Sequence, residues 1–168
     1  MDAKRLLPLL DAALRAERDG FGFYSQALSG SDDSGAKDVF AHLAEEERRH
    51  FEALQKEYRS ILDGSGWDSG ISLGDRWSPD GAGRIFSASF RERIGEKHLE
   101  MSALSIGILL EKNSESLYRQ AASEEPDPEI RGFLTELADW EAGHYRTLLA
   151  EDELLRDAYW NENRFSPI

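Results

Sequence analysis

The stretch "LAEEERRHFEAL", residues 43–54, decides the fold expected for this chain. Glu47 and His50 stand three residues apart in it, so a helix places both side chains on one face. The same spacing returns 94 residues later in "LADWEAGHYRTL", as Glu141 and His144. Such a pair is either a chance occurrence of two solvent-exposed residues on a charged helix or one half of a metal site.

The two halves of the chain match well beyond that pair at the same offset of 94 residues. In each half a single Glu precedes the Glu of the Glu-x-x-His pair by 30 residues, and a Tyr follows that single Glu by seven. The matched positions are Glu17 with Glu111, Tyr24 with Tyr118, Glu47 with Glu141, and His50 with His144. So many coincidences favour a duplicated metal site over an accident.

The interval of 30 residues has a geometric meaning in a pair of antiparallel helices. Two residues lie at the same height when they are equally far from the connecting turn. The midpoint of the interval falls in a turn-forming segment in both halves, "SGSDDSG" at 29–35 and "EEPDPE" at 124–129. Each hairpin therefore brings its single Glu beside its Glu-x-x-His pair, about 22 Å from the turn at the rise of an α-helix.

Apolar spacing of three and four residues predicts four helices and no convincing strand. On the first helix one face is predicted to hold Leu10, Leu14, Glu17, Phe21, Tyr24 and Leu28. The other three helices are predicted at about 36–63, 97–123 and 128–157. Asp127 is the expected N-cap of the last helix, with Pro128 at its first position. The sequence thus predicts one all-α domain over 1–168, a four-helix bundle of two antiparallel hairpins.

Residues 64–95 differ from the rest, since they are rich in Gly, Ser and Asp and carry Trp67, Trp77, Phe86 and Phe90. We expect a long ordered crossover here, with one short helix around 84–94. Some thirty residues easily span the roughly 45 Å that the chain must return if the second and third helices run parallel. The aromatic side chains also make the crossover the expected surface of a homodimer.

Composition and charge exclude several classes of partner and cofactor. With 168 residues and a net charge of −13, the chain has no basic patch for nucleic acid and is disfavoured at anionic membranes. It has no cysteine, which excludes disulfides, Cys-ligated zinc, iron–sulfur clusters and thiol catalysis. No apolar stretch is long enough to span a bilayer, and no secretory signal is evident, so a cytoplasmic location is expected.

Four Glu and two His are oxygen and imidazole ligands that suit Fe or Mn, with Zn as a further possible occupant. Carboxylates that bridge two ions offset the repulsion between the dications. Without metal, burying this set would be costly, because unpaired buried charges are expensive. One Glu from each of two helices and Glu-x-x-His from the other two is the ligand set of ferritin-like dimetal carboxylate bundles.

The motifs "AERDGFGFY", "LAEEERRHFEAL", "LEKNSESLY" and "LADWEAGHYRTL" resemble the rubrerythrin-like branch of the ferritin-like superfamily over nearly the whole chain. The resemblance implies a ferritin-like fold with two Fe ions. The ligands that it implies are Glu17, Glu47, His50, Glu111, Glu141 and His144, with Tyr24 and Tyr118 touching the carboxylates. Two features depart from rubrerythrin. The chain lacks the cysteines of a rubredoxin domain, so electrons must come from a separate donor, and Ser114 replaces a further Glu.

The leading functional hypothesis is a non-haem di-iron oxidoreductase that reduces hydrogen peroxide or dioxygen with ferrous iron. The alternatives are a ferroxidase or iron-handling protein without a storage shell, and a metal-stabilised scaffold without catalysis. Among the other polar residues, Glu46 either accepts a hydrogen bond from a ligating imidazole or faces solvent, and its repeat equivalent, Trp140, has no acceptor. His42 and His98 have no repeat partners and are expected at the surface.

Overall fold

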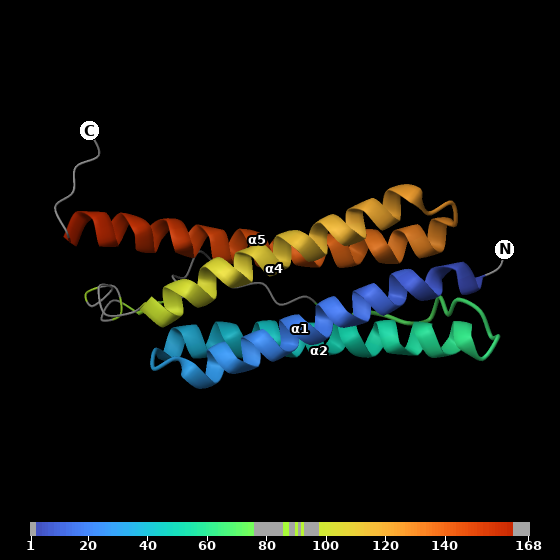
Figure 1. Cartoon of the computed structure of the whole chain (residues 1–168), viewed down its shortest axis with the longest axis horizontal. Helices are drawn as coiled ribbons and strands as arrows, with labels where there is room; N and C mark the ends of the chain where they lie inside the picture. The colour runs from blue at the N-terminus through green and yellow to red at the C-terminus, as the bar shows by residue number, and fades with distance from the viewer. Residues whose placement is uncertain (1–2, 76–85, 88–89, 91, 93–97, 163–168) are drawn as a thin grey trace.

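The protein is an all-α four-helix bundle built from two antiparallel hairpins (Figure 1). The computed structural model describes residues 3–75, 86–87, 90, 92 and 98–162. A short 3-10 turn, η1 (Ala3–Leu6), leads into the bundle, whose helices are α1 (Leu7–Gly30), α2 (Ser34–Leu62), α4 (His98–Glu124) and α5 (Pro128–Glu162). α2 and α4 run in the same direction (Figure 1), which is the arrangement for which a long crossover was expected. None of the described helices is both long and apolar enough to cross a membrane.

Polar caps fix the two turns that set the hairpin register. The Asp33 side chain accepts the backbone N–H of Ala36 at 3.0 Å and so caps α2, which begins two residues before the predicted start. Asp127 caps α5 as predicted, because its Oδ1 accepts the N–H of Glu129 at 2.9 Å. α5 continues five residues past the predicted end, to Glu162.

The buried face of α1 differs from the predicted one. Its buried residues are Leu10, Ala13, Glu17, Gly20, Tyr24 and Ala27. Phe21, predicted on that face, is 40% exposed. The reason is close packing, since a Cβ at Gly20 would lie 3.0 Å from Glu47 Oε2. Small residues alternate with large ones along this face, so α2 can approach α1 at the level of the carboxylates.

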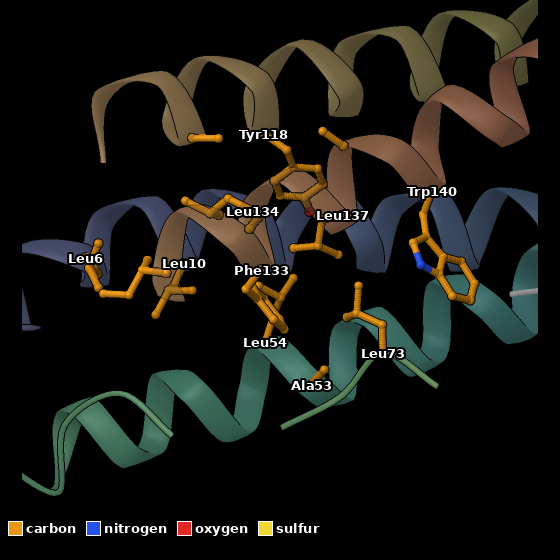
Figure 2. Close-up of a cluster of buried hydrophobic side chains, with 14 of the residues drawn as sticks. Leu6, Leu10, Ala53, Leu54, Leu73, Tyr118, Phe133, Leu134, Leu137 and Trp140 are labelled. Atoms are coloured by element: carbon orange, nitrogen blue, oxygen red, sulfur yellow. The ribbon is translucent and has the colours of Figure 1, made fainter. Parts of the chain in front are cut away.

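Two apolar clusters fill the interior, one on each side of the ionisable residues. The first, shown in Figure 2, includes Leu10, Leu54, Tyr118, Leu134 and Leu137. The second is built from Tyr24, Phe40, Leu43, Leu104 and Leu148, together with further buried residues. On each of the four helices the predicted metal ligands lie, in sequence, between the residues of one cluster and those of the other. The apolar clusters therefore close the site off at both ends of the bundle.

The described parts of the crossover pack onto the bundle. Leu73 is buried in the first apolar cluster, and Trp67 packs edge-on against Phe133 with ring centroids 5.3 Å apart. Phe86 and Phe90 stack on one another and are each 1% exposed. The crossover aromatics that the structure describes thus pack within the chain, and the dimer surface stays a prediction. Trp77 and most of the predicted helix at 84–94 lie outside the described residues.

Two buried carboxylates tie the crossover down, and sequence patterns did not predict them. Glu57 accepts the backbone N–H of Asp68 at 3.1 Å, and Glu151 accepts that of Phe86 at 3.1 Å. Glu57 and Glu151 are themselves 94 residues apart, so they extend the repeat. Burial raises the pKa of Glu57 to about 7.

We expect Glu57→Gln to stabilise the metal-free protein at alkaline pH. The folded-state pKa of about 7 exceeds the ordinary 4.5, so the folded chain binds this proton more tightly than the unfolded chain does. That contribution is complete below pH 4.5 and is lost as pH rises through 7. Gln keeps the shape without the charge, which should add about 1–3 kcal/mol to the free energy of unfolding at pH 8. Urea unfolding in chelator between pH 5 and pH 8 measures the difference.

The matched control is Glu153→Gln, which changes an exposed carboxylate on α5. Its stability should follow that of the wild type at every pH. Parallel curves for wild type and Glu57→Gln would show that the Glu57 carboxylate ionises as easily in the folded chain as in the unfolded one.

Candidate metal centre

All six predicted ligands meet in the middle of the bundle. They come from all four helices, and none of them is more than 4% exposed: Glu17, Glu47, His50, Glu111, Glu141 and His144. The sequence therefore predicted the convergence of these side chains correctly. Their role as metal ligands is a separate question, which depends on their geometry.

The six side chains form two overlapping groups, each able to hold a metal ion. One group is Glu17, Glu47, His50 and Glu141, and the other is Glu47, Glu111, Glu141 and His144. In each group one ligand atom per residue lies within 4.8 Å of the others. Glu47 and Glu141 belong to both groups, as carboxylates that bridge two ions would.

Both imidazoles direct the same nitrogen at the carboxylates. His50 Nδ1 lies 3.2 Å from Glu17 Oε2 and 3.4 Å from Glu141 Oε1. His144 Nδ1 lies 3.3 Å from Glu111 Oε2 and 3.5 Å from Glu47 Oε1. Each imidazole thus approaches the single Glu of its own hairpin and the paired Glu of the other. The two halves repeat these contacts, as the sequence repeat implies.

The two tyrosines cross between the hairpins. Tyr24 on α1 donates to Glu111 Oε1 on α4, and Tyr118 on α4 donates to Glu17 Oε1 on α1. Burial and the neighbouring carboxylates, Glu111 for Tyr24 and Glu17 for Tyr118, raise the pKa of both phenols well above the ordinary value. Both tyrosines therefore keep their protons and orient the single Glu of the opposite hairpin, as the resemblance implied.

Carboxylates outnumber imidazoles in this site, and its electrostatics reflect that excess of acidic groups. Burial, together with repulsion from neighbouring carboxylates, raises the pKa of Glu47 and Glu141 well above the ordinary value. The pKa of Glu17 shifts in the opposite direction. Although burial opposes it, hydrogen bonding to His50 and attraction to it lower the pKa of Glu17. Two of the four carboxylates thus resist ionisation until a cation is near, and cation binding would release their protons.

A further buried carboxylate, Glu46, stands outside both groups. It is 1% exposed, and its Oε2 lies 2.7 Å from His144 Nε2. Of the two roles open to Glu46 from the sequence, the structure selects the hydrogen bond over solvent exposure. His42 is exposed, as predicted. The His98 side chain lies outside the described residues.

The donor set could hold metal. Four carboxylates and two imidazole Nδ1 atoms face one another in the buried interior, and Glu141 Oε1 makes no hydrogen bond among the described residues. Oxygen and imidazole ligands suit divalent iron, manganese or zinc. Comparison of the chain with protein-family models, curated proteins and solved structures gave no match. The case for a metal site therefore depends on the structure of this chain alone.

Proposed function

We propose that this protein is a rubrerythrin-like di-iron oxidoreductase that reduces hydrogen peroxide or dioxygen with electrons from a separate donor. The observation that carries the proposal is the pair of overlapping four-residue groups that share Glu47 and Glu141. Shared carboxylates support two ions held close together. Iron, when bound, supplies the electrons: two ferrous ions give up the two that one hydrogen peroxide needs, with two protons, to become two waters.

The residues of the chain would have three tasks in this chemistry. Glu17 and Glu111 would each help to hold one of the two ions, and the Tyr24 and Tyr118 hydroxyls keep these two carboxylates in place. The apolar clusters on either side keep bulk water out, which strengthens the electrostatic interactions inside. Glu47 and Glu141 give up their protons on metal binding and then offset the charge of both ions.

Anaerobic titration with ferrous iron, followed by peroxide, tests the proposal. We expect two Fe²⁺ per chain, oxidation of both by one equivalent of peroxide, and repeated turnover when an artificial reductant is supplied. Glu136→Gln, which alters an exposed carboxylate on α5, serves as a control and should behave like the wild type.

Other outcomes would replace the proposal with one of the alternatives. Oxidation followed by release of ferric iron would indicate an iron-handling protein. Tight metal binding without any reaction toward peroxide or dioxygen would indicate a scaffold.

A homodimer is also expected, and sedimentation at micromolar concentration tests it. The exposed Ile106 and Leu109 on α4 are available for such contact.

A further inference from the structure

The two halves of the site differ on the side of the imidazoles that faces away from the carboxylates. Glu46 and Trp140 occupy equivalent positions of the 94-residue repeat, each just before the paired Glu. Glu46 Oε2 lies 2.7 Å from His144 Nε2. Trp140 instead packs edge-to-face against the His50 ring, with ring centroids 4.8 Å apart. His50 Nε2 is buried, and it has no hydrogen-bond partner among the residues that the structure describes.

This difference matters for a metal held through Nδ1. An imidazole that binds a cation through Nδ1 carries its proton on Nε2. A carboxylate that accepts this N–H fixes the tautomer and the ring orientation and makes the imidazole a stronger ligand. His144 has that acceptor in Glu46. An indole ring offers none, since its only polar group is an N–H donor.

Glu46 is itself held in position. Its Oε1 lies 3.3 Å from Arg49 Nη2, while Arg49 Nη1 donates to the Asp75 carbonyl of the crossover at 3.0 Å. The Arg49 guanidinium also lies over the Trp140 ring, 5.5 Å from its centroid. Because Glu46 is 1% exposed, it cannot turn its charge into water. Packing and an ion pair thus hold the acceptor at His144 before any metal arrives.

We propose that Glu46 is a positioning residue that makes the two metal positions unequal. The cation held by Glu47, Glu111, Glu141 and His144 binds first and more tightly. The cation held by Glu17, Glu47, Glu141 and His50 binds second and exchanges more easily. This inference rests on the proposed metal centre, and it adds an order of filling that the symmetry of the six ligands does not require.

Titration of the metal-free protein with Co²⁺, followed by absorption and calorimetry, tests the order. For the wild type we expect two resolved steps whose affinities differ by about tenfold or more, the range over which partners of ligating histidines act. Glu46→Gln should weaken the first step by about tenfold and bring the two steps together. Trp140→Phe, the matched control at the equivalent position, keeps an apolar ring beside His50 and should leave the two steps distinct.

A second set of variants assigns the steps to the two imidazoles. With His50→Ala in the background, the remaining Co²⁺ should lose affinity when Glu46→Gln is added. With His144→Ala in the background, adding Glu46→Gln should change nothing. A general loss of folding cannot produce that contrast. If Glu46→Gln folds poorly, Glu46→Asp takes its place in the test. It draws the carboxylate back from His144 and should give a smaller shift in affinity in the same direction.

The outcomes separate this inference from the metal centre itself. Two Co²⁺ ions that bind with equal affinity, or with affinities that ignore Glu46, would overturn the inference and leave the metal centre intact. Equal effects of Glu46→Gln in the His50→Ala and His144→Ala backgrounds would also overturn it. Failure of the wild type to bind any Co²⁺, Fe²⁺ or Zn²⁺ would instead remove the metal centre.

Discussion

The double variant His50→Ala, His144→Ala is expected to lose both metal ions while keeping its helices. Each imidazole directs Nδ1 at two carboxylates of the site, and each of the two candidate ligand groups contains one of them. Removing an imidazole leaves three carboxylates, a set with lower affinity for iron or zinc than one that includes nitrogen. Each single variant should therefore lose one ion, and the double variant should lose both. Elemental analysis of protein loaded with ferrous iron and desalted measures the loss.

His42→Ala is the matched control, because His42 lies on the same helix as His50 and is exposed. Its metal content should equal that of the wild type. Far-UV circular dichroism of each variant shows whether the helices persist without the imidazoles. A double variant that binds as much iron as the wild type would disprove the assignment of His50 and His144 as ligands.

The sequence was sufficient to predict the convergence of the six side chains, and the reason is geometric. An antiparallel hairpin fixes which residues share a height once its turn is located. The turns were recognisable from Asp, Ser, Gly and Pro at 29–35 and 124–129. A repeated interval of 30 residues then placed Glu17 beside Glu47, and Glu111 beside Glu141. Local periodicity and one internal repeat were therefore enough to predict the fold and the side chains that converge in it.

What the sequence left open depends on contacts between distant segments. Phe21 fits the helical period of the buried face, yet Gly20 takes the place next to Glu47, where a Cβ would lie only 3.0 Å from Glu47 Oε2. No sequence pattern singled out Glu57, which is fully buried and accepts the backbone N–H of Asp68 in the crossover. Helical spacing alone cannot reveal which charged residues an irregular segment will bury.

Glu46 is an intermediate case. Its position before Glu47 made a hydrogen bond to an imidazole one of two possibilities, and the asymmetry with Trp140 was already visible in the repeat. The structure adds that the imidazole is that of His144, on the opposite hairpin. The choice of partner follows from how the two hairpins pack, and a pattern within one helix holds no information on that.

The second large effect concerns stability. We expect Glu141→Gln to stabilise the metal-free protein and to destabilise it relative to wild type once metal is added. Glu141 is 1% exposed, and burial together with repulsion from Glu17 and Glu111 raises its pKa well above the ordinary value. A raised folded-state pKa means that stability falls as pH rises from the ordinary value through the folded one. Gln removes this loss, so the gain without metal should grow with pH.

A tenfold difference in proton affinity between the folded and the unfolded chain is worth about 1.4 kcal/mol. In a chain of this length, each kcal/mol shifts Tm by roughly 2–4 °C. With metal the order should invert, because a ligand at a hundred times its Kd stabilises the folded state by about 2.7 kcal/mol per site. Glu141 belongs to both candidate ligand groups, so Gln should weaken both ions. Thermal unfolding of both proteins, in chelator and in excess Zn²⁺, measures the crossing. Glu136→Gln, the exposed control on the same helix, should give curves that match wild type in both conditions. If Glu141→Gln is less stable than wild type in chelator at pH 8, the Glu141 carboxylate stabilises the fold without metal. The buried carboxylates would then not need a cation to offset their burial.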